Sequence, residues 1–397
     1  MEDGNHKTRT YGEDKVGHAT SLSISRKQFL SRIGIGSAAV ALGATGLLVG
    51  CEQQQGKEQD AASQEGGQNQ SQGRAGKSQI SLTWVAQQQA AQSGQRALKG
   101  FQNYVKSKNL DWDVTVTDAK GDPGTLSKMV TDAATRGSDA IIVAFGTLTA
   151  AQGALKNVEK AGTPFFSLDS GYFQPAICDI ASNNYEIGAK MSEYMVQRLL
   201  GQGKDRAKIC TVTANFHHGT RKRGKVRDAV LSENEWIEVL ADRVIQYENF
   251  YETTLNTVND WLTRYGDEID AIWTPWDEPG TAAAMAIKNS GRDVNDIFVV
   301  GADGHPPAVK QMRDDSSWPF VATPAQSFEL WGALVGYFVE EIVGKGRPTE
   351  EVVPVPIVEV PAPMIVQGRN VPPEDKMPWE ATDFYQTFED KAKEYVA

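Results

Sequence analysis

Polar side chains follow several apolar runs of this chain, at the points where those runs end. They are Gln87 to Gln89, Asp169, Trp276 with Asp277, Asp303 and Gln326. None of these positions holds a lysine, and the sequence around them shows no spacing typical of metal ligands. An ionised Asp accepts two hydroxyl hydrogen bonds with charge assistance, and an amide both donates and accepts. These residue types therefore favour a neutral ligand rich in hydroxyl groups, a sugar or a polyol.

The apolar runs alternate with amphipathic segments of helical spacing. One series comprises residues 80–85, 114–116, 140–143 and 164–168, and a second comprises 208–212, 271–273, 297–300 and 320–322. Apolar strands that alternate with helices indicate parallel sheets covered on both faces. We therefore predict an α/β fold of two doubly wound parallel-sheet lobes. Because such sheets bind ligands outside the carboxyl ends of their strands, two facing lobes would gather the polar residues in one cleft.

Composition excludes several classes of function. The 397 residues suffice for two to three domains, and 40 Lys and Arg against 51 Asp and Glu give a net charge of -11. A net negative charge repels the phosphate backbone of nucleic acids, so we expect no nucleic-acid partner. Three cysteines without a CxxC pair build neither a disulfide framework nor a zinc site, and Cys178 and Cys210, each inside an apolar run, are expected to be buried free thiols.

The amino-terminal region has the pattern of an export signal. Residues 33–51 carry no charge and end in Leu-Val-Gly-Cys, which resembles a lipobox with lipid on Cys51. Residues 25–30, Ser-Arg-Lys-Gln-Phe-Leu, resemble a twin-arginine motif in which Lys27 replaces the second arginine. We predict a signal peptide over 1–50 and a chain held at the outer face of the cytoplasmic membrane or in the periplasm. An uncleaved amino-terminal anchor is the alternative.

Two further segments flank the predicted lobes. Residues 51–79 are rich in Gln, Gly, Ser and Glu with scarcely any large apolar side chain, so they predict a flexible tether. Residues 370–397 form a carboxyl-terminal extension whose helical pattern indicates docking against one lobe.

Five motifs in order carry a resemblance to a known family. They are residues 165–169, 180–184, 220–224, 299–304 and 322–326. Together they resemble the ribose-binding-like periplasmic sugar-binding proteins, the substrate-binding components of ABC importers with the type I fold, over about 80–365. The resemblance implies three crossings between the lobes, near 183, 326 and 360. It implies one lobe from 80–183 plus 327–360 and a second from 184–326 plus 361–369.

The resemblance also implies ligand-binding residues. Asp169, Arg221, Asp303 and Gln326 fall where such proteins place ligands of sugar hydroxyls, and Asn184 lies in the motif at the first crossing. We add Asn184 to the candidate ligand-binding residues.

The chain departs from this family at two places. Trp276 stands before Asp277 where relatives often have Asn, and the loop 87–93 carries glutamines, Gln89 among them, where relatives often have aromatic residues. Phe250 or Tyr251 would supply a stacking face. We count Gln89, Phe250, Trp276 and Asp277 as candidate ligand-binding residues. We do not infer from the resemblance that the bound sugar is ribose.

Structural roles compete with several of these assignments. Asp169 and Asp303 could be helix caps, Trp276 could be core, and Arg221 could lie on a solvated face. His217 and His218 are expected to point to opposite faces of an extended segment, with no carboxylate spaced nearby, so we predict no metal site.

The sequence contains no GxSxG, HExxH, Walker or GxGxxG motif, so we predict neither enzymatic activity nor a cofactor. The expected function is that of a monomeric lipoprotein that captures a sugar or polyol for an ABC permease with a cytoplasmic ATPase. An exported sensor that signals to a membrane receptor or kinase is the alternative.

Overall fold

The computed structural model describes residues 79–373 and 388–396. The predicted signal peptide, Cys51 and all but the last residue of the predicted tether lie outside the described residues. Within the described part of the chain, no helix is both long and apolar enough to span a bilayer.

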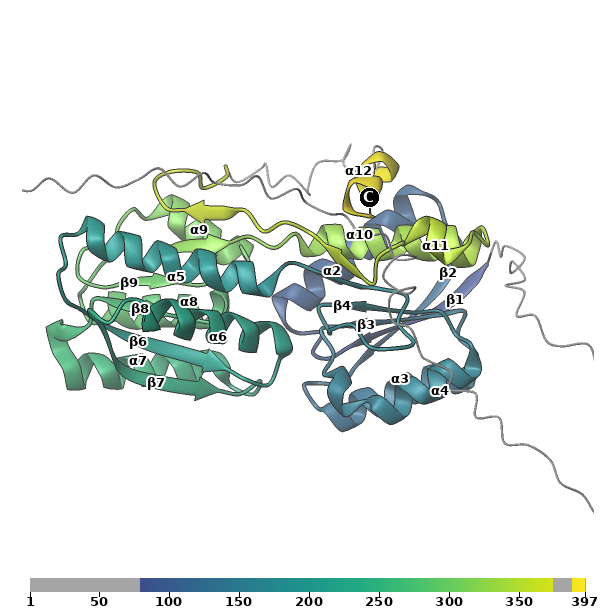
Figure 1. The fold of residues 1–397 in the computed structure, drawn as a ribbon, viewed down its shortest axis with the longest axis horizontal. Helices are drawn as coiled ribbons and strands as arrows, with labels where there is room; N and C mark the ends of the chain where they lie inside the picture. Colours follow the sequence, from purple (N-terminus) through teal and green to yellow (C-terminus); the bar gives the residue numbers. More distant parts are fainter. Residues whose placement is uncertain (1–78, 374–387, 397) are drawn as a thin grey trace, which may run out of the picture. The chain divides into compact units, whose positions relative to one another are not determined.

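Six strands form a first sheet that is parallel throughout (Figure 1). They are β1 (Ile80–Ala86), β2 (Trp112–Asp118), β3 (Ala140–Ala144), β4 (Phe165–Leu168), β5 (Asp179–Ala181) and β11 (Ile357–Glu359). Their order across the sheet is β2-β1-β3-β4-β5-β11. The reversal of order at β1 and β3 defines a doubly wound sheet with a switch point between these two strands.

The second sheet repeats this arrangement. Its strands are β6 (Ala207–Ala214), β7 (Ile237–Ile245), β8 (Ala271–Trp273), β9 (Phe298–Val300), β10 (Phe320–Pro324) and β12 (Met364–Val366). The order is β7-β6-β8-β9-β10-β12, and only β12 pairs antiparallel with its neighbour. The predicted fold class is therefore confirmed.

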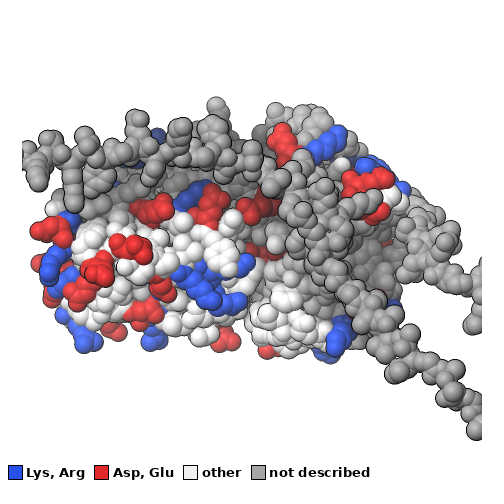
Figure 2. Space-filling view, viewed as in Figure 1, with Lys and Arg blue, Asp and Glu red and all other residues white. Residues whose placement is uncertain are grey.

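Helices cover both faces of each sheet (Figure 1). Around the first sheet lie α2 (Gln92–Ser107), α3 (Pro123–Arg136), α4 (Gln152–Ala161), α10 (Phe328–Val339) and α11 (Thr349–Val352). Around the second lie α5 (Asn184–Gly201), α6 (His218–Ser232), α7 (Phe250–Tyr265), α8 (Asp277–Asn289) and α9 (Pro306–Asp314). Lys and Arg are interspersed with Asp and Glu on the face that Figure 2 draws.

The strands are buried on both faces because alternate side chains enter different cores. In β3, Ile142 packs in the core that contains α2 and α10, whereas Ile141 and Val143 pack in the core that contains α3 and α4. This explains why the strands read as continuous apolar runs. Cys178 and Cys210 are buried free thiols, as predicted.

The chain passes between the two sheets three times. It leaves the first sheet after β5, returns from β10 into α10, which packs on α2, and crosses again between β11 and β12. Backbone hydrogen bonds secure the last crossing, from Val360 N to Ala181 O and from Ala325 N to Pro363 O. The carboxyl-terminal helix α12 (Phe388–Val396) contacts α10 and β11.

Helices α2 and α10 pack unusually closely, because glycines stand at their contact. A Cβ atom on Gly100 would lie 1.9 Å from the Glu329 carbonyl oxygen, and one on Gly332 would lie 1.9 Å from that of Ala97. The close approach lets Arg96 of α2 pair with Glu329 of α10 through two parallel hydrogen bonds of 2.8 and 2.9 Å. Arg96 also contacts the carbonyl oxygens of Asp303 and Gln326.

Candidate functional site

A pocket lies at the carboxyl ends of the strands, lined by residues of both sheets' connections. Its lining consists of Gln88, Ala91, Ser93, Phe145, Asp169, Phe216, His217, Thr220, Arg223, Tyr247, Phe250, Trp276, Glu278, Asp303, Gln326 and Phe328. These residues follow β1, β3 and β4 of the first sheet and β6 to β10 of the second. The pocket therefore joins the switch points of two doubly wound sheets, where ligands of such folds bind.

Three strand-end residues of this lining adopt the left-handed backbone region. The φ angles are 59° at Phe145, 40° at Asp169 and 110° at Asp303. Such conformations cost roughly 1–3 kcal/mol each in non-glycine residues and cluster at functional sites. Here they turn the chain sharply after each strand.

A hydrogen-bonded chain links the two aspartates of the pocket. Asn184 Nδ2 donates to Asp169 Oδ1 at 2.9 Å, and Asn184 Oδ1 accepts from Arg223 Nε at 2.8 Å. Arg223 Nη1 then donates to Asp303 Oδ1 at 3.1 Å and to the Pro275 carbonyl at 2.8 Å. All four side chains are buried, so each polar group is compensated by the next.

Gln326 completes the polar wall. Its Nε2 donates to Asp303 Oδ1 at 2.6 Å, and its buried Oε1 has no hydrogen-bond partner among the described residues. Burial raises the pKa of Asp303, opposed by the nearby charges of Arg223 and His305. A buried acceptor next to a carboxylate is a suitable partner for ligand hydroxyl groups.

Arg96 of α2, which belongs to the half built on the first sheet, supports this polar wall. Its Nη1 lies 3.3 Å from the Asp303 carbonyl oxygen and 3.2 Å from His305 Nδ1, and its Nη2 donates to the Gln326 carbonyl at 3.1 Å. His305 Nε2 lies 3.3 Å from Glu278. Burial would lower the pKa of His305, but the Glu278 charge and hydrogen bond outweigh it and raise that pKa.

Aromatic side chains form other parts of the lining. Phe216 and Tyr247 lie 4.0 Å apart between ring centroids, and the Trp276 ring meets Phe250 edge-on at 5.2 Å. Carboxylates on one side and ring faces on another match a ligand with hydroxyl groups at its edge and C–H groups on its faces.

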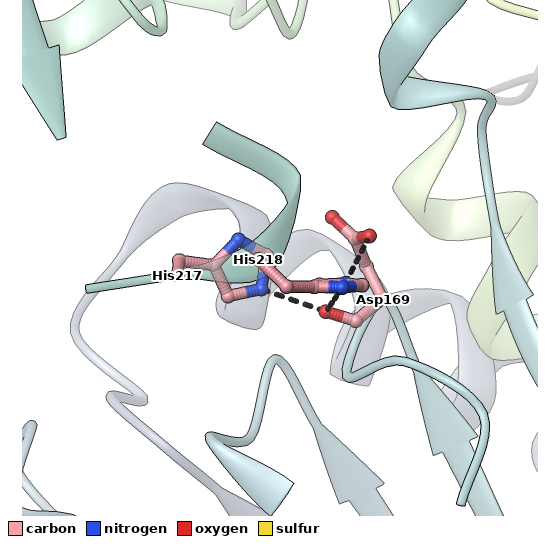
Figure 3. Close-up of side chains that lie close together, drawn as sticks. All are labelled: Asp169, His217 and His218. Atoms are coloured by element: carbon pink, nitrogen blue, oxygen red, sulfur yellow. Dashed lines mark hydrogen bonds and ion pairs between the residues drawn. The ribbon is translucent and has the colours of Figure 1, made fainter. Parts of the chain in front are cut away.

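Three side chains of the half that contains the second sheet contact Asp169, and Figure 3 shows two of them, His217 and His218. Besides the bond from Asn184, His217 Nε2 lies 2.7 Å from its carbonyl oxygen, and His218 Nε2 lies 3.1 Å from that oxygen and 3.1 Å from Oδ1. The prediction that the two histidines point to opposite faces is wrong. The extended segment ends at His217, which caps α6, so the chain turns there and both rings reach the same residue.

The predicted site residues fall into three groups. Asp169, Phe250, Trp276, Asp303 and Gln326 line the pocket. Asn184 lies behind the lining and joins Asp169 to Arg223. Asp277, Arg221 and Gln89 form the third group, which lies off the lining.

Asp277, Arg221 and Gln89 do not line the pocket. Asp277 is fully buried and accepts from His305 N at 2.6 Å and from Thr323 Oγ1 at 2.7 Å, which orients it away from a ligand. Arg221 donates to the Asn215 carbonyl at 3.2 Å on the half-exposed side of α6. Gln89 binds the Asp118 carboxylate through its backbone N–H.

Sequence reasoning missed Arg223 and the aromatic residues Phe145, Phe216, Tyr247 and Phe328. The one signal for Arg223 is its spacing, because it shares one helical face with Thr220, three positions earlier. That spacing becomes informative only once the start of α6 is known.

Two groups of side chains in the described residues are close enough to share a cation: Asp169 with His217 and His218, and Glu278 with Asp303 and His305. In the first group, His217 Nδ1 accepts from Gly219 N at 3.2 Å, so its hydrogen lies on the Nε2 that faces the Asp169 carbonyl. In the second, His305 Nδ1 faces Arg96. Both groups are therefore already engaged in hydrogen bonds.

Two doubly wound halves around one pocket define a two-lobed ligand-binding protein. Residues 83–344 match the family model described as periplasmic binding protein domain, so the chain belongs to that family. Members of this family are transport binding proteins, and the prediction that the chain is not an enzyme agrees with this membership.

The chain is similar to proteins with named ligands. It is 24% identical over 266 residues to the xylitol-binding protein of Mycolicibacterium smegmatis, covering 66% of this chain and 71% of that one. It is 25% identical over 259 residues to the ribose import binding protein of Bacillus subtilis, covering 65% and 80%. An ABC transporter solute binding protein from Agrobacterium vitis with bound allitol superposes with a TM-score of 0.63 at 21% identity, covering 79% and 99%. This last likeness confirms the fold.

Proposed function

We propose that this chain is an exported binding protein of an ABC importer that captures a sugar or polyol in the pocket and delivers it to the membrane permease. The observation that carries the proposal is the buried polar wall of Asp169, Asn184, Arg223, Asp303 and Gln326. Hydrogen bonds among these side chains hold them in place, which lowers the entropic cost of ordering them around a ligand.

The composition of the pocket limits the ligand class. Arg223 is the one arginine of the lining and it is paired with Asp303, whereas Asp169, Glu278 and Asp303 supply three carboxylates. An anionic ligand would meet these carboxylates, so a neutral polyhydroxylated ligand is favoured. The named ligands of the similar proteins, xylitol, ribose and allitol, belong to this class.

Titration calorimetry of the full chain with ribose, xylitol, allitol and myo-inositol at pH 7.5 tests the proposal. We expect at least one of them to bind with a stoichiometry of about one. Ribose 5-phosphate is the anionic control, because a phosphate ester replaces its 5-hydroxyl group, and we expect it to bind far more weakly. Binding of the phosphate ester alone would contradict the proposed ligand class.

The anchor is a separate part of the proposal. We propose that lipid on Cys51 holds the mature chain at the membrane, on the basis of the uncharged run that ends in Leu-Val-Gly-Cys. A Cys51→Ala variant should leave the membrane fraction or remain unprocessed. Identical processing and fractionation of the variant and the wild type would contradict the anchor.

A further inference from the structure

We propose that His217 and His218 form a proton-sensitive latch: in their neutral form they hold Asp169 across the pocket, and their protonation releases the two halves and the ligand. The inference rests on the proposed ligand-binding function and adds a condition under which the ligand is released. It starts from the hydrogen bonds of the two imidazoles to one residue of the opposite half (Figure 3).

The hydrogen-bond partners of His217 define its charge state. Nδ1 accepts the backbone N–H of Gly219, and Nε2 donates to the Asp169 carbonyl oxygen at 2.7 Å. A second proton on Nδ1 would place two donors face to face and would remove the cap of α6. The positive end of the α6 dipole opposes that proton as well. The latch geometry therefore requires a neutral His217.

His218 makes the complementary contact. His218 Nε2 lies near the carbonyl oxygen and Oδ1 of Asp169. Both oxygens are acceptors, so Nε2 carries a hydrogen. The two rings stand perpendicular at 4.8 Å between centroids. Two imidazolium ions at this distance would repel each other.

Charged groups from α6 and from the loop after β4 face the pair. Arg221, Lys222 and Arg223 of α6 oppose protonation of His217, and the Asp169 carboxylate after β4 favours that of His218. Burial is the largest effect and, with these cations, it lowers the pKa of each histidine to about 4. Tyr247 of the adjoining loop lies near Asp169, and burial raises its pKa, so it stays neutral.

Opening of the pocket would expose both rings to water, where histidine has a pKa of about 6.5. Protons therefore bind the open form more tightly than the closed form, and acid favours opening. For a shift from about 4 to about 6.5, lowering the pH from 7.5 to 5.5 weakens ligand binding about ten-fold for one imidazole and about a hundred-fold for two.

Calorimetry at pH 7.5, 6.5 and 5.5 measures this effect, with the tightest binder among ribose, xylitol, allitol and myo-inositol as the probe. A double variant His217→Gln, His218→Gln keeps N–H donors for Asp169 but does not titrate. We expect the wild type to lose at least ten-fold in affinity and the double variant less than three-fold. Lys225→Gln, an exposed charge on the same helix, is the matched control and should keep the wild-type profile.

The outcomes separate the two proposals. If none of the four compounds binds at pH 7.5, the proposed function fails. If one binds with equal affinity from pH 7.5 to 5.5, or if the double variant retains the wild-type pH dependence, the latch fails and the binding function stands.

Three further measurements cover a misfolded variant or a missing ligand. Circular dichroism at each pH checks that the variants fold. NMR titration of the imidazoles in the wild-type chain gives a second readout, with midpoints near pH 6.5 in an open form and near 4 in a latched form. Small-angle scattering of the ligand-free chain should show a larger radius at pH 5.5 than at 7.5 in the wild type. The latch would be overturned if the imidazole midpoints did not differ between the open and latched forms and the radius did not change between pH 7.5 and 5.5.

Discussion

Arg223 lies 3.1 Å from Asp303 in the buried wall of the pocket, and the two residues come from different helix-strand units of the second half. Arg223 satisfies one oxygen of Asp303 and, through Asn184, also supports Asp169. A single guanidinium thus couples both pocket aspartates, so changes at these residues should not act independently.

Asp303→Ala should weaken binding of a cognate sugar or polyol by roughly ten-fold to over a hundred-fold. Removing a charged hydrogen-bond partner typically costs about 1.5–3 kcal/mol, and about 1.4 kcal/mol corresponds to a factor of ten. Calorimetry measures the affinity, and circular dichroism checks the fold. A folded variant with wild-type affinity would remove Asp303 from the site.

Arg223→Ala and Arg221→Ala form a matched pair on one helix. Loss of Arg223 removes one of the two charged neighbours of Asp303, the other being His305, and leaves Asn184 Oδ1 without its donor, so we expect at least a ten-fold loss of affinity. Arg221→Ala should change affinity less than two-fold, because its guanidinium contacts only the Asn215 carbonyl among the described residues. The opposite ranking would favour the assignment implied by the family resemblance.

Trp276→Ala should weaken binding several-fold, by loss of a ring face worth on the order of 1 kcal/mol. It should also reduce the change in tryptophan fluorescence on ligand addition. Trp236→Ala is the control, because Trp236 is half-buried and does not line the pocket. A ligand-dependent fluorescence change that survives in Trp276→Ala but disappears in Trp236→Ala would contradict the placement of the ligand.

Gly332→Ala should destabilise the fold by roughly 1–3 kcal/mol or more, because the new methyl group would overlap the Ala97 carbonyl and separate α2 from α10. Gly153→Ala tests the substitution alone, since no atom lies within 4 Å of the added Cβ and alanine favours helix. Urea unfolding measures both variants. Equal stability of the two would refute the close contact.

Asp179 should make stability depend on pH. Burial raises its pKa to about 7 from an ordinary value of 3.8, although Ser167 Oγ and two backbone N–H groups stabilise its ionised form. The folded state then holds a proton that the unfolded state has lost, so this contribution to stability is complete below pH 3.8 and disappears as the pH rises through about 7.

Asp179→Asn removes this titration. We expect the wild type to lose on the order of 2–3 kcal/mol relative to the variant between pH 5 and pH 8, measured by urea unfolding. Parallel pH profiles of the two proteins would show that burial does not perturb Asp179.

Much of the architecture follows from local patterns. Strands buried on both faces need continuous apolar residues, so β1, β3 and β6 were visible in the sequence, and so were Asp169 and Asp303 at strand ends. The edge strand β7 was missed, because most of its side chains are not buried and its sequence mixes Glu, Asp and Arg with apolar residues. An edge strand lacks the pattern of a central one.

The fold class, the family resemblance and the strand-end polar residues could be predicted from the sequence, because they depend on periodicity and on order along the chain. Which side chains meet depends on how the elements pack in three dimensions. The turn at His217 sets the face of α6, so Arg223 rather than Arg221 enters the pocket. Thr323 and the His305 backbone hold Asp277 away from it. The contact of His217 with Asp169 spans 48 positions and joins opposite halves, and no local pattern encodes a distance that depends on how two sheets pack.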